Sequence, residues 1–162
     1  MTQVAEMDTH RLLDLESPEA THALGIRLGR ALRPGDFVGL VGGLGAGKTH
    51  FARGVAEGAG IDPGQVSSPT YAVVQSYQGS LVLHHADLYR LEREAELEAT
   101  GFFDLDDGTA ALLVEWIDQV PGVAPRDSLR IELRPNGPTA RVFYASAGGP
   151  RSRALLTRWL DG

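Results

Sequence analysis

Two short apolar runs mark the chain, and each leads directly into residues that can do chemistry. Residues 36–41 precede a glycine-rich loop, and residues 110–114 end at Glu115. Runs of this length that are apolar on both faces are typical of buried parallel strands. Other apolar or alternating patterns predict strands over residues 9–15, 70–77, 81–85, 129–134 and 141–145, the last two as a hairpin that turns at 135–138.

Helical patterns fill the intervals between these runs. A Ser-Pro-Glu start signal at residues 17–19 opens a helix in which leucines recur every four residues, and a Pro-Gly pair at 34–35 stops it. Further helices are predicted over residues 50–57, 93–100 and 151–160, of which the second is acidic and exposed. No linker is long enough to divide the chain, so residues 1–162 are expected to form one α/β domain.

Lysine occurs once in the sequence, at Lys48, although Lys and Arg together number 15. It lies in the octet GGLGAGKT over residues 42–49, which matches G-x-x-x-x-G-K-[ST], the phosphate-binding loop of nucleotide triphosphatases. A compact ammonium on a flexible stem follows phosphate oxygens, whereas a planar guanidinium suits fixed bidentate pairing. The glycines let backbone N–H groups approach the anion at a helix N-terminus.

The octet has two other interpretations. One is a glycine-rich strand-to-helix turn without a ligand. The other is a dinucleotide site, which is disfavoured because Lys48 occupies the third glycine position of G-x-G-x-x-G. The octet therefore predicts a nucleotide phosphate site.

Carboxylates at two strand ends are the candidates for metal binding and catalysis. Glu115 ends an apolar strand, where phosphate-loop enzymes place an acidic magnesium partner, and Asp87 follows the strand 81–85. The structural alternative is that Glu115 marks a strand end and Asp87 caps a loop. His84 and His85 point to opposite faces of a strand, so only one of them can join Asp87, which argues against zinc.

Two flanking segments extend the candidate site. Trp116 either packs in the core or forms a wall of the nucleotide site. Ser68-Pro69-Thr70 lies after the loop helix, where triphosphatases often keep a switch that senses the γ-phosphate.

Composition narrows the classes of function. The chain is 43% hydrophobic, has a net charge of −6 and contains no cysteine. The acidity argues against a broad basic surface that grips nucleic acid unaided, and the absence of cysteine excludes disulfides and thiolate metal sites. No membrane-spanning or leader-like segment is evident, so a soluble cytoplasmic protein is expected.

Taken in order, these motifs resemble the bacterial TsaE (YjeE) family. The matching pieces are G-x-L-G-A-G-K-T, Ser68-Pro69-Thr70-Tyr71, the stretch HADLYRL over residues 85–91, and Val114-Glu115-Trp116. The family is the ATPase component of the system that installs threonylcarbamoyladenosine in tRNA. The resemblance extends from about Glu19 to Arg141.

The resemblance implies a fold, ligands and partners. The expected fold is a P-loop NTPase-like three-layer sandwich whose central sheet is mostly parallel with antiparallel additions. The expected ligands are ATP and Mg²⁺, with slow hydrolysis by the protein alone. The expected partners are TsaD and TsaB, with tRNA reached indirectly through their complex.

The resemblance also assigns residues by motif position. Lys48, Asp87 and Glu115 are the expected catalytic residues, and Thr49, Glu115 and Asp87 are the expected metal ligands. Nucleotide contacts are expected from Thr21, Gly43, Leu44, Gly45, Ala46, Gly47, Lys48, Thr49, His50, Ser68, Thr70 and Trp116. Either Asp87 or Glu115 positions the attacking water.

Two positions depart from the family pattern. Gly43 replaces a usual aspartate, and His50 replaces a usual second threonine, so a carboxylate and a hydroxyl contact are lost. A P-loop small-molecule kinase is the alternative function, although no arginine-rich lid is evident. A GTP switch is disfavoured because no second lysine remains for an N-K-x-D motif, and a nucleotide-binding scaffold without hydrolysis stays open.

Overall fold

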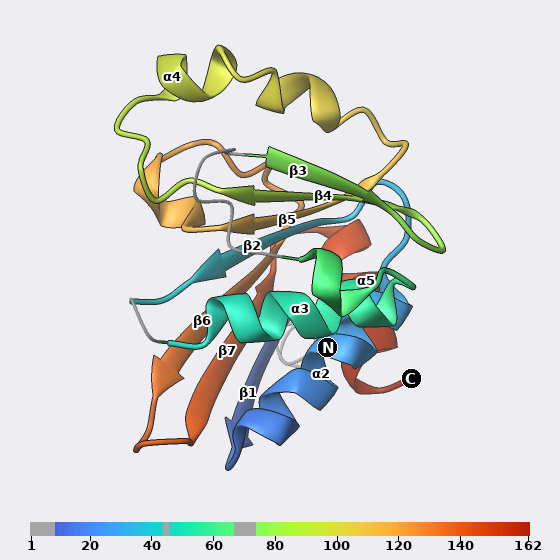
Figure 1. Ribbon diagram of the computed structural model, residues 1–162, viewed down its shortest axis with the longest axis vertical. Coiled ribbons are helices and arrows are strands. Elements are labelled where there is room, and N and C mark those ends of the chain that lie inside the picture. The colour runs from blue at the N-terminus through green and yellow to red at the C-terminus, as the bar shows by residue number, and fades with distance from the viewer. Residues whose placement is uncertain (1–8, 44–45, 67–73) are drawn as a thin grey trace, which may run out of the picture.

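The structure is a computed structural model that describes residues 9–43, 46–66 and 74–162. Its centre is a seven-stranded sheet with the order β1-β7-β6-β2-β5-β4-β3 (Figure 1). The strands are β1 (His10–Leu15), β2 (Phe37–Val41), β3 (Val74–Gln78), β4 (Val82–Asp87), β5 (Ala111–Glu115), β6 (Leu129–Pro135) and β7 (Arg141–Ala147). Strands β6, β2, β5 and β4 are parallel, and β3, β7 and β1 add antiparallel pairs at the two sides.

Helices cover both faces of this sheet. The α-helices are α2 (Pro18–Ala31), α3 (Lys48–Gly58), α4 (Glu94–Glu98) and α5 (Pro150–Leu160), and the 3-10 helices are η1 (Pro63–Gln65), η2 (Phe102–Leu105) and η3 (Ile117–Gln119). Figure 1 shows α2, α3 and α5 on one side, with α4 and the segment that follows it on the other. The expected three-layer α/β sandwich with a parallel centre is therefore confirmed.

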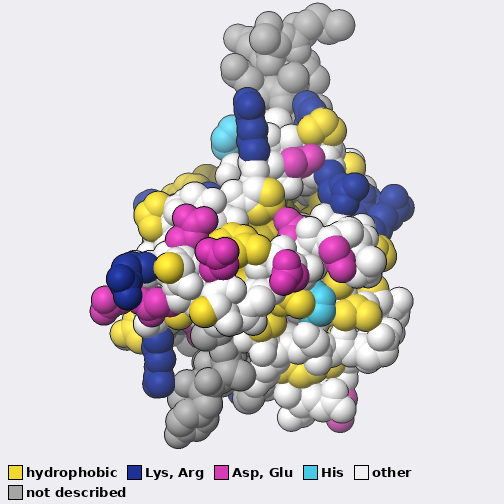
Figure 2. Space-filling view, turned by 90° about the horizontal axis from the view of Figure 1, so that it is seen from above, with side chains coloured by type: hydrophobic (Ala, Val, Ile, Leu, Met, Phe, Trp, Pro, Cys, Tyr) yellow, Lys and Arg dark blue, Asp and Glu magenta, His cyan; other side chains and the backbone are white. Residues whose placement is uncertain are grey.

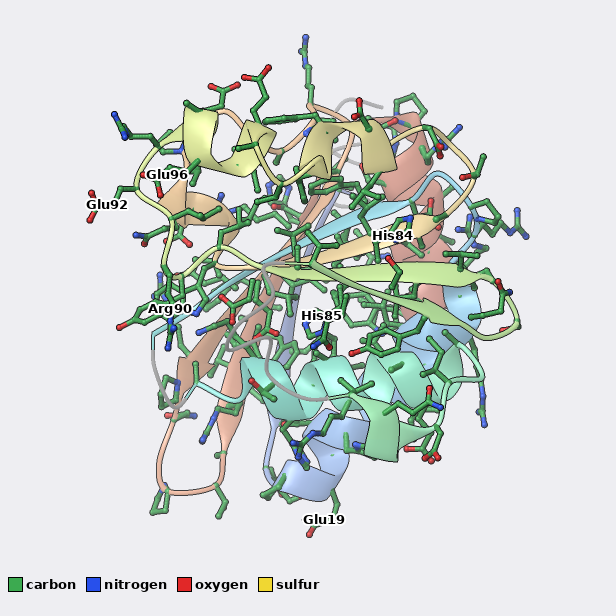
Figure 3. The ribbon with its side chains drawn as sticks, turned by 45° about the horizontal axis from the view of Figure 1, so that its top comes forward. Glu19, His84, His85, Arg90, Glu92 and Glu96 are labelled. Atoms are coloured by element: carbon green, nitrogen blue, oxygen red, sulfur yellow. The ribbon has the colours of Figure 1, made fainter. Side chains whose placement is uncertain are left out.

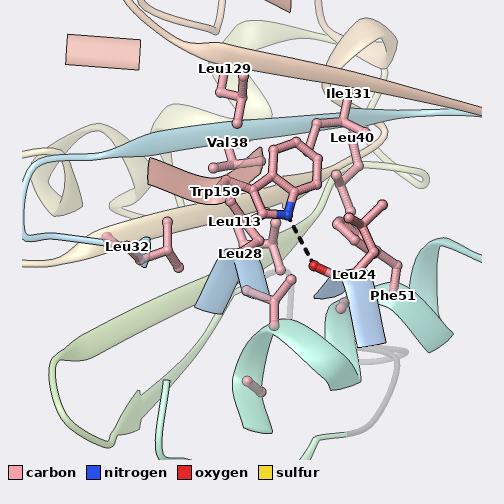
Figure 4. Close-up of a cluster of buried hydrophobic side chains, with 14 of the residues drawn as sticks. Leu24, Leu28, Leu32, Val38, Leu40, Phe51, Leu113, Leu129, Ile131 and Trp159 are labelled. Carbon is pink, nitrogen blue, oxygen red and sulfur yellow. Dashed lines mark hydrogen bonds between the residues drawn. The ribbon is translucent and has the colours of Figure 1, made fainter. Parts of the chain in front are cut away.

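The larger core lies between the sheet and α2, α3 and α5. Trp159 of α5 is 1% exposed, and its indole N–H donates to the Leu24 carbonyl of α2 at 3.0 Å (Figure 4). A buried indole thereby keeps a hydrogen-bond partner while its ring packs against Phe51 at 6.3 Å between centroids. Trp159 thereby joins the C-terminal helix α5 to both α2 and α3.

The start of α2 follows the signals in its sequence. The Ser17 hydroxyl accepts from the Ala20 N–H at 3.1 Å, and proline occupies the first turn. The leucines at 24, 28 and 32 are all buried, so the four-residue recurrence is the helix face that enters the core.

Helices α2 and α3 approach each other through glycines. A Cβ added to Gly29 would lie 2.0 Å from the Val55 carbonyl oxygen, and one added to Gly54 would lie 2.5 Å from the His22 carbonyl oxygen. No side chain fits at these distances. The close contact fixes the position of α3, and hence of the loop that precedes it.

Several predicted boundaries shift. Strand β4 runs on to Asp87 because that residue pairs in register with Glu115 of β5. The acidic helix predicted over 93–100 is only Glu94–Glu98, and Gly101 with a φ of 79° begins the next turn. Residues 70–73 of another predicted strand lie outside the described residues, and the strand that follows them ends at Gln78.

The face over α4 and η2 is acidic. Figure 2 shows Asp and Glu side chains gathered on this face. The exposed acidic residues of α4, of η2 and of the segment that follows include Glu94, Glu98, Asp104 and Asp107. Of the two adjacent phenylalanines, Phe102 is buried in the smaller core, whereas Phe103 is 38% exposed.

Candidate nucleotide-binding site

The glycine-rich loop joins the end of β2 to the start of α3, as the sequence predicts. Gly47 precedes the helix with a φ of 98°, a left-handed conformation that favours glycine. The Arg141 guanidinium donates from Nε to the Ala46 carbonyl at 2.9 Å. This hydrogen bond links the loop to the first residue of β7. Leu44 and Gly45 lie outside the described residues.

Lys48 is enclosed by the loop and by Trp116. Its side-chain ammonium donates to the carbonyl of Gly42 at 2.5 Å and to that of Gly43 at 2.8 Å, and lies 4.0 Å from the centroid of the Trp116 ring. Burial lowers the pKa of Lys48, while the negative charges of Glu115, Asp87 and Asp118 oppose that shift. The ammonium thus lies within the field of the carboxylates proposed for the site.

The two candidate carboxylates lie side by side. Asp87 and Glu115 are register partners at the carboxyl ends of β4 and β5, and Leu40 of β2 pairs with Glu115 on its other side. Paired positions on adjacent strands share a face of the sheet. Burial raises the pKa of Asp87, as does Glu115, whereas the Tyr89 N–H bond, His85 and Lys48 lower it.

Glu115 has a buried partner that the sequence did not reveal. His85 Nε2 lies 2.6 Å from Glu115 Oε2, and both side chains are 2% exposed. His84 lies on the other side of β4 (Figure 3), where its Nδ1 is 2.7 Å from the Ser76 hydroxyl. The expectation that only one histidine can join the site is confirmed. The alternation of side chains along β4 predicted that His84 and His85 lie on opposite faces. The parallel register of β4 with β5 brings His85 to Glu115.

Trp116 combines both interpretations offered for it. It is half-buried against the smaller core, and it also covers the ammonium of Lys48. Its φ is 59°, and among the described residues it is the one residue other than glycine that has a left-handed backbone conformation. The ring of Tyr89 lies 4.8 Å from it, so an aromatic pair borders the site.

A small hollow of about 90 Å³ opens beside Gly47 and His50. Thr21 also lines it, and the Thr21 hydroxyl is buried without a hydrogen-bond partner in the described part of the chain. A buried polar atom is normally paired, so this hydroxyl is available to a ligand in the hollow. His50 Nε2 lies 3.1 Å from the Pro18 carbonyl, which orients the imidazole at the rim.

The donor set suits magnesium with phosphate. Thr49 is half-buried as the second residue of α3, next to Lys48. Within the described ranges, no group of three or more His, Asp or Glu side chains is arranged to hold a metal ion. Mg²⁺ typically uses one or two carboxylates together with substrate phosphates, which fits Thr49, Glu115 and Asp87. Ser68 and Thr70 lie outside the described residues.

Comparison with known proteins decides the family. A family model described as "Threonylcarbamoyl adenosine biosynthesis protein TsaE" matches residues 15–143. The chain belongs to the TsaE family. The predicted resemblance is thereby confirmed, and it extends slightly beyond the span inferred from the motifs.

Several TsaE relatives cover most of the chain. The tRNA threonylcarbamoyladenosine biosynthesis protein TsaE of Bacillus subtilis (strain 168) is 37% identical over 140 residues, covering 86% of this chain and 87% of that protein. The protein of the same description from Treponema pallidum is 39% identical over 123 residues, covering 73% and 87%. The crystal structure of Bacillus subtilis YdiB superposes with a TM-score of 0.78 at 30% identity over 93% of both chains.

TsaE-family membership places the chain in tRNA threonylcarbamoyladenosine biosynthesis. Across the part of the chain that the structure describes, no helix has the length and apolar content to cross a bilayer.

Proposed function

We propose that this TsaE-family chain is a Mg²⁺-dependent ATPase that supports threonylcarbamoyl modification of the tRNA adenosine next to the anticodon. The observation that carries the proposal is the convergence of Lys48, Asp87 and Glu115 at the carboxyl ends of β2, β4 and β5. Phosphate-loop triphosphatases need a cation for the phosphates and a carboxylate for the metal at this edge.

Each residue has a distinct role in the proposal. Lys48 and the loop N–H groups bind the β- and γ-phosphates, and Thr49 with Glu115 holds the metal. Bound Mg²⁺ neutralises charge that develops on the phosphate oxygens. His85 orients the Glu115 carboxylate through its 2.6 Å contact.

Asp87 is assigned to the attacking water. It is half-exposed, whereas Glu115 is buried and engaged by His85. One Asp87 oxygen accepts the Tyr89 N–H at 2.9 Å, which fixes the orientation of the carboxylate. Because its pKa is raised, the Asp87 carboxylate is a stronger base than an ordinary aspartate and accepts a proton from water more readily.

The nucleoside is assigned to the side of the loop on which the hollow beside Gly47 opens. The Thr21 hydroxyl faces the hollow without a partner among the described residues, and the His50 imidazole lies at its rim. The α-phosphate would meet the N–H of His50, so the sugar would lie next to this hollow.

The partners proposed are TsaD and TsaB, which activate slow hydrolysis, with tRNA reached through their complex. The compartment proposed is the cytoplasm, which a cysteine-free composition favours.

Phosphate release from ATP with and without TsaD and TsaB tests the proposal. We expect Lys48→Ala to lower the partner-stimulated rate by at least about a hundredfold. Arg93→Ala is the matched control, because it removes a cation whose side chain is 79% exposed, and it should keep the wild-type rate. Release that does not depend on Lys48 contradicts the proposal, and a phosphorylated small acceptor in the mass spectrum would establish a kinase instead.

A further inference from the structure

A second, larger hollow lies at the opposite end of β2 from the phosphate loop. It has a volume of about 440 Å³ and lies between the C-terminal ends of α2 and α5. Four arginines line it: Arg27, Arg30, Arg33 and Arg158. The chain has 15 Lys and Arg residues and a net charge of −6, so four arginines at one hollow form a locally positive site on an acidic protein.

The hollow is separate from the nucleotide site. Arg33 and Asp36 precede the first residue of β2, whereas Gly42 follows its last residue. Five strand residues span about 16 Å, so the same ligand group cannot contact both ends.

Helix ends explain only part of this arginine cluster. Arg158 donates from Nε to the Ala31 carbonyl at 3.0 Å, and Arg27 donates from Nη2 to the Leu160 carbonyl at 3.1 Å. These bonds cap the carbonyl ends of α2 and α5, where cations are favourable. Each guanidinium has five N–H donors, so both retain donors for a further acceptor.

The other two arginines have no such structural duty. Arg30 and Arg33 are exposed, and within the described residues neither guanidinium has a hydrogen bond or an ion pair. Their side chains are therefore free to turn toward a ligand without loss of a contact that holds the fold.

The charge balance in the hollow is positive. No acidic side chain is among the described residues that line it, and the buried Asp36 behind it pairs with Arg158 at 3.1 Å between Oδ2 and Nη2. Four guanidinium groups thus outnumber the two carboxylates at the hollow, which are the side-chain carboxylate of Asp36 and the main-chain carboxylate of Gly162, the last residue of the sequence. Burial lowers the pKa of Arg158, Asp36 opposes that shift, and the nearby charge of Arg33 lowers it further, as expected for crowded cations.

We propose that this arginine hollow binds phosphate groups, with an RNA backbone as the ligand. The planar fork of arginine matches the oxygens of phosphate, and a concave site lets several forks reach the same group. RNA is the source preferred because it is the substrate class of the proposed function, on which this choice rests. The hollow would contact the RNA directly, in addition to the route through TsaD and TsaB. The acidic face over α4 and η2 would repel the same ligand, which disfavours RNA contact on that face.

Binding of a tRNA transcript and of inorganic pyrophosphate to the full chain tests the inference, with calorimetry as the readout. The double variant Arg30→Ala/Arg33→Ala removes the two cations without structural bonds. We expect it to weaken transcript binding at least tenfold and to lower the slope of log affinity against log salt by about two. The control Arg93→Ala/Arg130→Ala removes the same charge from exposed positions elsewhere and should stay within twofold of wild type.

The outcomes separate the ligand source and the two proposals. Transcript binding that depends on Arg30 and Arg33 supports the inference. Binding of pyrophosphate without binding of the transcript would show that the ligand is a free phosphate compound, and it overturns the RNA assignment. No binding by wild type, equal loss in the control pair, or equal affinity for polyglutamate overturns it altogether. Lys48→Ala should lose ATP binding but keep transcript binding, so a failed ATPase and a failed arginine hollow give different results.

Discussion

His85 Nε2 lies 2.6 Å from Glu115 Oε2 in the buried interior, and this contact joins two adjacent parallel strands at the candidate site. The imidazole fixes the carboxylate that the proposed function assigns to magnesium. A partner of this kind acts by positioning a ligand, and its loss typically reduces metal affinity by about 10–100-fold.

We therefore expect His85→Gln to weaken Mg²⁺-dependent ATP binding by about 10–100-fold. Binding of ATP without Mg²⁺ should change little, because Lys48 and the loop stay intact. The control is His84→Gln, one residue earlier on the opposite face of β4, which should bind like wild type. Equal weakening with and without Mg²⁺ would show that His85 only supports the fold.

The charged Lys48 lowers the folding stability of the ligand-free protein, because burial disfavours its ammonium form and lowers its pKa. Lys48→Met removes the charge but keeps the length of the side chain. We expect the variant to match or exceed the wild-type free energy of unfolding at neutral pH, although it loses ATP binding. A depressed lysine pKa means that the cost is present while the ammonium is charged and fades as pH rises from the folded-state pKa toward the ordinary value of 10.5. The stability difference between variant and wild type should therefore narrow at alkaline pH, and denaturant unfolding across pH measures it.

The glycine contact between α2 and α3 predicts an intolerant position. In Gly29→Ala, the added Cβ would meet the Val55 carbonyl oxygen at 2.0 Å, so the helices must separate. Overpacking of this kind costs about 1–3 kcal/mol, and thermal unfolding measures it. Gly43→Ala is the control, since a Cβ added there would have no atom within 4 Å. Equal melting temperatures for the two variants would contradict the close packing.

Asp36 predicts a pH dependence of stability. Burial raises its pKa above the usual 3.8, although the Arg33 N–H and the charges of Arg158, Arg151 and Arg33 oppose the shift. The folded state then holds the proton more tightly than the unfolded state, so wild type loses stability as pH rises from about 3.8 through the folded-state pKa. Relative to wild type, Asp36→Asn should gain stability over that window.

Asp127→Asn is expected to change the pH dependence of stability in the direction opposite to that of Asp36→Asn. Burial tends to raise the pKa of Asp127, but hydrogen bonds from Ser152 and Arg151 outweigh it and the pKa is lowered. Its stabilisation is present above the usual value and is lost as pH falls through the folded-state pKa. The Asn variant should be weaker than wild type at neutral pH, and the gap should close in acid. Stability differences that change with pH in the same direction for the two variants would contradict at least one of the two assignments.

Local signals in the sequence predicted much of the framework. The Ser17 cap, the leucine recurrence in α2 and the strand-loop-helix around Lys48 depend on neighbouring residues, and all three are present. The positions of Asp87 and Glu115 at strand ends also followed from local pattern. These features are local because caps, helix periodicity and strand ends are determined within a few residues.

Pairing across the sheet and between helices was decided only by the tertiary structure. The sequence placed His85 on one face of a strand, but only the parallel register of β4 with β5 brought it to Glu115. In the same way, Arg27, Arg30 and Arg33 meet Arg158 because α2 and α5 end at the same edge of the sheet. Strand register and helix packing depend on the burial of the whole core, so residues far apart in sequence become neighbours that no local pattern predicts.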